Sequence, residues 1–238
     1  GGYLPLEDKR HFVTAVILAG GSGSRMNLGV TKQRLLIDGE SVLHRSVRAF
    51  EECDIVDAIV VVSKQEEREF ALSETTDLKK VAMVVAGGNT RAESARCGFD
   101  SIPEESEFVA IHDAARCLIT PEMIAKVVKA AIKYGAATAA TKVADSIKRV
   151  GNDGCIFESV PREDLYAAQT PQVFRIEDYA SGLKKCSSDT SVTQDNMIVE
   201  SIGKKIFCVD CGGENIKITK TEDVSYAEFL IKRRRGNV

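Results

Sequence analysis

The chain has 238 residues, of which 44% are hydrophobic and 28% charged, and its formal net charge is -3. This composition is ordinary for a globular protein, and chains of this length commonly fold as one α/β domain. No apolar run approaches the roughly 20 residues that a membrane helix needs, and the acidic balance gives no general attraction to nucleic acid. We therefore expect a single domain over residues 1–238, with neither a membrane nor a nucleic acid as partner.

The seven cysteines are an odd number and lack the spacing of a disulfide framework. Cys208 and Cys211 form a CxxC pair, but no second pair of Cys or His lies near enough to complete a zinc site. The first residues lack the basic and apolar segments of a secretory signal. A reducing, cytoplasmic location is expected.

Short runs rich in β-branched residues alternate with helical patterns in the first half of the chain. The runs predict strands at residues 15–18, 58–62, 81–85 and 108–112. The segments between and after them predict helices at residues 41–53, 65–72, 90–102 and 121–134. This alternation predicts an α/β fold with a parallel sheet covered by helices on both faces.

The pattern changes after a further strand at residues 137–143. Two alternating segments, residues 146–150 and 155–160, flank the turn Gly151-Asn152-Asp153-Gly154, which predicts a β-hairpin within an arm over residues 144–162. A two-stranded ribbon is only marginally stable by itself, so we expect the arm to pack on something larger, such as a second subunit. The remaining predicted elements are helices at residues 176–186, 195–202 and 222–234, and a strand at residues 205–209.

A glycine-rich loop follows the first strand and reads Leu18-Ala19-Gly20-Gly21-Ser22-Gly23-Ser24-Arg25. Glycines let the backbone approach a ligand closely, and successive N–H groups can then point at phosphate oxygens. The loop matches neither the P-loop nor the dinucleotide-binding pattern GxGxxG. Arg25 and Lys32 follow where they could reach phosphates held by the loop, although a plain tight turn with surface charges is the alternative interpretation.

Two later segments are expected at the same edge of the sheet, where open α/β sheets bind ligands. Arg91 and Ser94 lie about one helical turn apart and can face a ligand together, although a capped helix with a solvated arginine would look the same. Asp113 ends the fourth strand and offers a carboxylate of the kind that Mg²⁺ takes together with substrate phosphates. His112 beside it is expected to make a structural hydrogen bond.

Several motifs together resemble a known family. They are the glycine loop followed by Lys32-Gln33, the run Gly87-Gly88-Asn89-Thr90-Arg91-Ala92-Glu93-Ser94, His112-Asp113-Ala114-Ala115-Arg116, Asp145-Ser146-Ile147-Lys148, Gln169-Thr170-Pro171-Gln172, and Glu214-Asn215-Ile216-Lys217-Ile218-Thr219. Across all but the first dozen residues, the chain resembles the sugar- and polyol-phosphate nucleotidyltransferases, and among them the 2-C-methyl-D-erythritol 4-phosphate cytidylyltransferases. The resemblance implies a Rossmann-like nucleotidyltransferase fold with a mainly parallel sheet, and a homodimer joined by a β-hairpin dimerisation arm.

The resemblance also implies roles for individual residues. The residues implied to bind CTP are Ala19, Gly20, Gly21, Ser22, Gly23, Gly88, Asn89, Arg91, Ser94 and Ala114. Those implied to be catalytic are Arg25, Lys32 and Lys217, and Asp113 would share a Mg²⁺ ion with CTP. Those implied to bind the polyol phosphate are Arg116, Ser146, Arg162, Thr170 and Thr193, with Arg162 reaching across a dimer interface.

The reaction implied is transfer of the cytidylyl group of CTP to a polyol phosphate, with release of pyrophosphate. The sequence departs from the usual family pattern at Thr31, Arg34, Cys117, Ser146 and Gln194. A ribitol-5-phosphate cytidylyltransferase and a catalytically idle nucleotide-binding protein therefore stay open as alternatives at this point.

Overall fold

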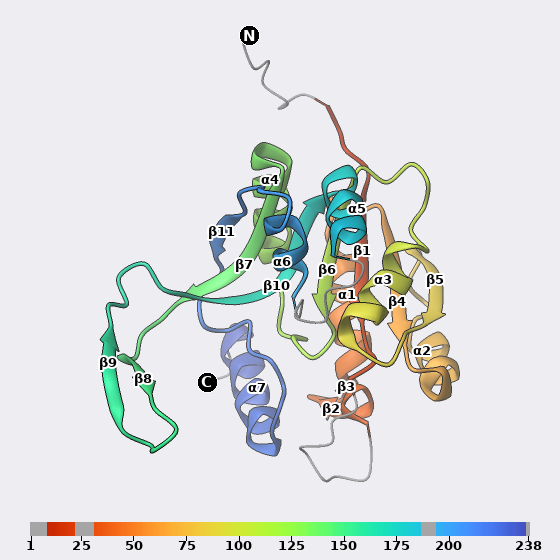
Figure 1. Ribbon diagram of the computed structural model, residues 1–238. Helices are drawn as coiled ribbons and strands as arrows, with labels where there is room; N and C mark the ends of the chain where they lie inside the picture. The colour runs from red at the N-terminus through yellow and green to blue at the C-terminus, as the bar shows by residue number, and fades with distance from the viewer. Residues whose placement is uncertain (1–8, 22–30, 187–193, 237–238) are drawn as a thin grey trace.

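A seven-stranded sheet forms the centre of the molecule in a computed structural model that describes residues 9–21, 31–186 and 194–236 (Figure 1). Its strand order is β11-β7-β10-β6-β1-β4-β5. The strands are β1 Val13–Leu18, β4 Ala58–Ser63, β5 Val81–Ala86, β6 Phe108–Asp113, β7 Ala136–Lys142, β10 Tyr166–Arg175 and β11 Phe207–Asp210. Only β10 runs antiparallel to its neighbours among these strands, so the prediction of a mainly parallel α/β sheet is confirmed.

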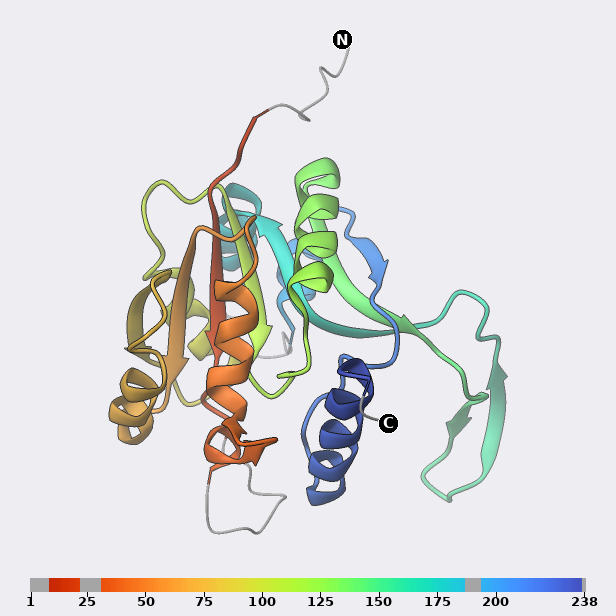
Figure 2. The ribbon, with the colours of Figure 1, turned by 180° about the vertical axis from the view of Figure 1, so that it is seen from behind.

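Helices cover both faces of this sheet. They are α1 Val42–Glu51, α2 Arg68–Glu74, α3 Arg91–Phe99, α4 Pro121–Tyr134, α5 Ile176–Lys185, α6 Asp195–Glu200 and α7 Thr221–Arg234, with the 3-10 turns η2 Lys32–Arg34 and η3 Gln65–Glu67. Helices α3, α5 and α6 cover one face (Figure 1), and α1 and α4 cover the other (Figure 2). None of the helices in the described ranges is long and apolar enough to cross a membrane.

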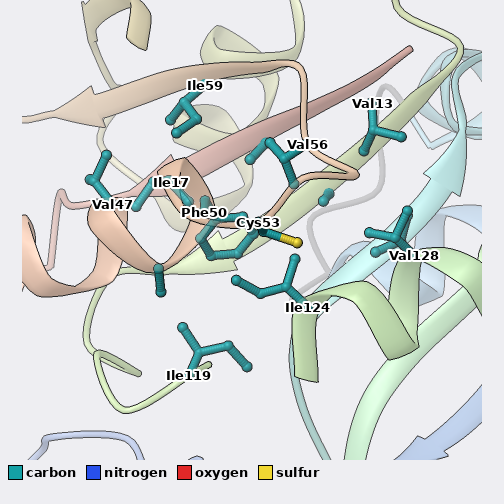
Figure 3. Packing of buried hydrophobic residues seen from close by; sticks show 14 of the residues in the cluster. Val13, Ile17, Val47, Phe50, Cys53, Val56, Ile59, Ile119, Ile124 and Val128 are labelled. Carbon is teal, nitrogen blue, oxygen red and sulfur yellow. The ribbon is translucent and has the colours of Figure 1, made fainter. Parts of the chain in front are cut away.

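The core beneath α1 and α4 is a layer of fully buried aliphatic and aromatic side chains. Phe50 of α1 and Ile124 of α4 pack there with Ile17 of β1 and Ile59 of β4 (Figure 3). Strands buried on both faces need such unbroken apolar runs, which explains why the sequence of β1 and β4 is almost continuously hydrophobic. This rigid layer fixes the strand ends from which the loops of the site extend.

Side-chain caps determine where the helices near the carboxyl edge begin. The Thr90 hydroxyl accepts a hydrogen bond from the Glu93 backbone N–H, and the Glu93 carboxylate accepts one from the Thr90 backbone N–H. These two reciprocal bonds form a capping box for α3. At α4 the Thr120 side chain accepts a hydrogen bond from the Met123 backbone N–H, and Pro121 occupies the first helical position, at the residue where the sequence predicts this helix to begin. The cap of α3 places Arg91 and Ser94 directly after the loop that leaves β5.

The predicted hairpin is confirmed. Strands β8 Ile147–Val150 and β9 Ile156–Val160 pair antiparallel, and they project away from the central sheet in both views (Figures 1 and 2). Val150, Ile156 and Phe157 on this arm are exposed. Packing of the arm on a second subunit stays a prediction.

One central strand was missed by the sequence analysis, which expected helical patterns after the hairpin. Strand β10 passes between β6 and β7 although it contains Pro171, a residue that normally argues against a central strand. Pro171 follows a cis peptide bond and lies where the pairing with β7 is interrupted, between Ala168 and Gln172. The missing N–H of proline is therefore placed at an irregularity of the ladder.

We expect Gly98→Ala to destabilise the fold, because a methyl group at Gly98 of α3 would lie 2.3 Å from Val16 of β1 and 2.8 Å from Val62 of β4. Overpacking of this kind costs about 1–3 kcal/mol. Urea unfolding of the variant measures the loss. Gly213→Ala is the matched control, since nothing lies within 4 Å of a methyl group there. Equal unfolding free energies for the two variants would contradict the close packing of α3 on the sheet.

Candidate active site

A cavity of about 420 Å³ lies at the carboxyl edge of the sheet. Loops after β1, β4, β5 and β6 border it, together with η2 and the segment that precedes α7. Its lining consists of Leu18, Gly20, Gly21, Lys32, Gln33, Lys64, Gly88, Asn89, Thr90, Arg91, Ser94, Asp113, Ala115, Lys217 and Thr219. Segments from both ends of the chain therefore meet at the edge where open α/β sheets bind ligands.

Nine of the candidate residues named from the sequence line this cavity: Gly20, Gly21, Lys32, Gly88, Asn89, Arg91, Ser94, Asp113 and Lys217. They include candidates for nucleotide binding, for catalysis and for metal binding. The structure thus brings together the glycine turn, two candidate cations and the candidate metal ligand in one cavity.

Asp113 is the acidic centre of the cavity. Its Oδ1 accepts a hydrogen bond from Arg91 Nε at 3.0 Å, and its Oδ2 accepts one from Lys217 Nζ at 2.7 Å. Burial would raise the pKa of this carboxyl, but the positive charges of Arg91 and Lys217 outweigh that effect and hold the pKa well below its usual value. Asp113 is consequently a carboxylate with a cation on each oxygen.

Arg91 bridges two carboxylates. Besides its bond to Asp113, its Nη1 donates to Asp195 Oδ2 at 2.6 Å, and Asp195 Oδ1 accepts from the Tyr179 hydroxyl at 2.7 Å. The neighbouring carboxylates raise the pKa of Arg91 even though burial opposes this shift. The guanidinium is therefore fixed between the end of β6 and the start of α6.

His112 lies beneath Asp113 and is completely buried. Its Nε2 lies 3.3 Å from the carbonyl oxygen of Arg116, which can only accept, so Nε2 carries the proton. Its Nδ1 then accepts from the Thr170 hydroxyl at 3.0 Å, while Thr170 Oγ1 accepts from the Asp113 backbone N–H at 3.0 Å. His112 thus has the structural role that its position at a strand end indicated, and it supports the backbone of Asp113.

Arg116 and Asn215 belong to a second polar layer below the cavity. Arg116 Nη1 donates to the Asn215 carbonyl at 2.8 Å, and Asn215 Nδ2 donates to Gln169 Oε1 and to the Thr170 carbonyl, each at 2.9 Å. The buried Nε of Arg116 and Oδ1 of Asn215 have no hydrogen-bond partner within the described part of the chain. This layer ties the segment before α7 to β10.

Close contact with α3 explains the two glycines after β5. A methyl group at Gly88 would lie 2.3 Å from the Glu93 side chain, and one at Gly87 would lie 2.6 Å from Ser94 Oγ. Larger residues would therefore push the loop away from the start of α3. The glycines keep the Asn89 backbone against the helix that carries Arg91 and Ser94.

Other candidate residues do not line the cavity. Thr170 and Arg116 lie in the polar network below it, and Ala19 and Ala114 are buried beside it. Ser146 and Arg162 are exposed at the two ends of the arm, where Arg162 donates to the Ala144 carbonyl oxygen. Four candidates lie outside the described residues: Ser22, Gly23, Arg25 and Thr193.

Sequence reasoning missed several residues of the site. Lys64 and Thr219 line the cavity, and Asp195 and Tyr179 hold Arg91. Lys64 could have been found, because it directly follows a predicted strand at the ligand-binding edge. The hydrogen bond between Tyr179 and Asp195 could not be predicted from the sequence, because it forms only through the packing of α5 against α6.

A cavity with room for a nucleotide, bordered by a glycine turn and cations at the carboxyl edge of an α/β sheet, defines a nucleotide-binding protein of the Rossmann-like class. Comparison with known proteins narrows this class. The family model described as 2-C-methyl-D-erythritol 4-phosphate cytidylyltransferase matches residues 13–233. The chain belongs to this family.

Individual relatives agree with the family match. Proteins named 2-C-methyl-D-erythritol 4-phosphate cytidylyltransferase from Pelotomaculum thermopropionicum and Caldanaerobacter subterraneus are 38% and 37% identical to the chain, over 95% and 93% of it and 97% and 99% of their own lengths. A crystal structure of 4-diphosphocytidyl-2C-methyl-D-erythritol synthase from Anaerococcus prevotii has a TM-score of 0.83 at 28% identity. That match covers 94% of this chain and 100% of the other.

We expect a pH-dependent loss of stability that depends on His112, because burial lowers the pKa of this imidazole from 6.5 to about 3. Between pH 6.5 and pH 3, His112 binds a proton in the unfolded chain but stays neutral in the folded chain. The free energy of unfolding should therefore fall as the pH drops from 6.5 towards 3, with a slope of up to about 1.4 kcal/mol per pH unit from this group.

Urea unfolding at several pH values between about 7 and 5 measures this slope. His112→Gln removes the titrating group, so its stability should vary less with pH than that of the native chain, whatever its absolute stability. Parallel curves for the two proteins would show that His112 is not the source of the dependence.

Proposed function

We propose that this chain transfers the cytidylyl group of CTP to 2-C-methyl-D-erythritol 4-phosphate, giving 4-diphosphocytidyl-2-C-methyl-D-erythritol and pyrophosphate. The observation that carries the proposal is the match of residues 13–233 to the family of that name. The cavity at the carboxyl edge supports it, because the lining contains Lys32 and Lys217 beside the glycine turn. The names of the relatives favour methylerythritol phosphate over ribitol 5-phosphate as the acceptor.

In the proposed reaction, a phosphate oxygen of the methylerythritol phosphate attacks the α-phosphorus of CTP. A new P–O bond forms there, and the bond from the α-phosphorus to the oxygen that bridges to the β-phosphorus breaks in line with it. The electron pair leaves with pyrophosphate. No general base is required, because a phosphate monoester is largely ionised near neutral pH.

The protein's contribution is to position the reactants and to stabilise charge. Negative charge builds up on the oxygens around the α-phosphorus and on the leaving pyrophosphate. Lys32 and Lys217 line the cavity and supply positive charge for these oxygens, and the glycine turn supplies backbone N–H groups. Arg25 is proposed to join them, although it lies outside the described residues.

Magnesium is the proposed cofactor, and Asp113 is the one protein ligand that we propose for it. The described part of the chain holds no group of three or more His, Cys, Asp or Glu side chains that could bind a metal ion. Asp113 offers hard carboxylate oxygens, each with one cationic partner. This donor set suits an ion that takes most of its ligands from a triphosphate. Bound there, magnesium would neutralise charge on the phosphate oxygens.

The experiment that tests the function is pyrophosphate release from CTP with methylerythritol phosphate, with ribitol 5-phosphate, and with no acceptor, each with Mg²⁺ and with a chelator. Release with methylerythritol phosphate and Mg²⁺ is expected. Preferential release with ribitol 5-phosphate would contradict the proposed acceptor. No release with either acceptor would favour the idle nucleotide-binding protein.

Lys32→Ala should lower kcat by about 100-fold or more while CTP affinity changes much less, because a cation that acts on developing charge stabilises the transition state more than the bound substrate. Lys129→Ala is the matched control, since Lys129 is exposed on α4 and lies outside the cavity lining. Steady-state kinetics and direct CTP binding measure the two effects. Small and equal losses in kcat and affinity would remove the catalytic role of Lys32.

We further propose a homodimer whose sites are completed by the arm of the partner. The arm exposes Val150, Ile156 and Phe157, and Arg162 lies just beyond β9, outside the cavity lining of its own chain. An exposed apolar ribbon gains stability by packing on another surface. This arrangement would deliver Arg162 to the polyol phosphate in a neighbouring subunit.

Mixing Lys32→Ala and Arg162→Ala subunits should restore activity above that of either parent, because one of the two sites in a mixed dimer would then receive an intact Lys32 and an intact Arg162. Sedimentation establishes the oligomeric state, and labelled subunits report that exchange has occurred. If exchange occurs and the mixture is no more active than the parents, Arg162 serves its own chain.

A further inference from the structure

Arg91 uses only part of its hydrogen-bonding capacity within the protein. Its Nε donates to Asp113 and its Nη1 donates to Asp195, while its Nη2 has no hydrogen-bond partner among the described residues. The side chain is 30% exposed and lines the cavity. A guanidinium held at two nitrogens with a third left open presents fixed N–H donors to whatever enters the cavity.

Asp195 is the more deeply buried of the two carboxylates that hold Arg91. Its side chain is 1% exposed, against 13% for Asp113. Its second oxygen accepts from Tyr179, whose ring is fully buried and stacks against Phe174 of β10. Asp195 is therefore held at both oxygens by Arg91 and Tyr179, whereas Asp113 lines the cavity and accepts from Lys217.

The two carboxylates therefore bind Arg91 from different sides, one from within the cavity and the other from outside its lining. Asp113 lines the cavity, so a cation that enters together with the nucleotide has access to its carboxylate. Asp195 lies outside the cavity lining and holds the guanidinium from behind, through a charge-assisted hydrogen bond of 2.6 Å. When a cation that accompanies the nucleotide competes with Arg91 for Asp113, the bond to Asp195 is the one that keeps Arg91 in place.

We propose that Asp195 is a positioning residue for nucleotide binding, which fixes the Arg91 guanidinium so that its open N–H groups face the oxygen atoms of the bound nucleotide. Tyr179 holds Asp195 in the orientation that this requires. The inference rests on the proposed function, since it takes CTP as the ligand of the cavity. It assigns Asp195 no contact with the substrate and no part in the chemical step.

The test uses Asp195→Asn, which keeps the size of the side chain and removes its charge. If Asp195 acts through Arg91, the dissociation constant and KM for CTP should rise about tenfold, the loss expected when a charged hydrogen bond is weakened, while kcat changes little. Tyr179→Phe should change both constants in the same direction by a smaller factor. Calorimetric titration with CTP and pyrophosphate-release kinetics provide the readouts.

A double-mutant cycle distinguishes positioning from a merely structural role. In an Arg91→Gln background, Asp195→Asn should cause no further loss of CTP affinity, because the group that it positions has been removed. Ile198→Val is the matched control on α6, where it removes a buried methylene without touching the Asp195–Arg91 pair. It should lower the unfolding temperature and leave the CTP dissociation constant unchanged.

Two results would overturn the inference. One is unchanged CTP affinity in both Asp195→Asn and Tyr179→Phe, in which case the proposed function would still stand if the native chain released pyrophosphate. The other is an equal loss from Asp195→Asn with and without Arg91, which would make Asp195 act by another route. A native chain that does not bind CTP would instead refute the proposed function, and the inference with it.

Discussion

The carboxylate of Asp113 stands at the end of the central strand β6, and three distant parts of the chain converge on it. Arg91 approaches from the start of α3 and Lys217 from the segment before α7, while Thr170 of β10 accepts the hydrogen bond of its backbone N–H. A buried negative charge is costly unless cations and hydrogen bonds compensate it. Its compensation therefore determines where each of these segments must lie, and the cavity takes its shape from them.

The polar layer beneath Asp113 extends this constraint into the fold. His112 can accept from Thr170 only while its Nδ1 is unprotonated, and Asn215 ties Thr170 and Gln169 to the last part of the chain. Each of these groups is buried, so an unmade bond at any one of them would carry the full cost of desolvation. The site is consequently held from below by this hydrogen-bonded layer.

Much of the fold could be predicted from the sequence, because the strongest signals are local. Apolar runs identified β1, β4 and β6, the helical pattern over residues 121–134 identified α4, and the glycine-rich turn at residues 151–154 indicated the hairpin. Strand β10 was missed because it contains Pro171, a residue that is unusual in central strands. Its place between β6 and β7 depends on pairing with strands far away in the sequence, which local patterns do not predict.

The site was predictable to a similar extent and for a similar reason. Residues that follow predicted strands, such as Gly88 and Asp113, could be placed at one edge from sequence alone, and they line the cavity. The pairing of Arg91 with Asp195 joins residues 104 positions apart and depends on the packing of α5 and α6. Such partners appear only when the side chains are placed in space.

The cavity is lined by residues from Leu18 to Thr219, which has a consequence for the order in which a ribosome makes this protein. The glycine turn and Asp113 emerge early, when β10 has not been made and neither Lys217 nor Asn215 exists. A nascent chain at that stage has a strand-end carboxylate without its lysine and without the acceptor for its backbone N–H. The cavity lining is therefore complete only when the segment before α7 has left the ribosome, because a chain that still lacks this segment lacks Lys217 and Thr219.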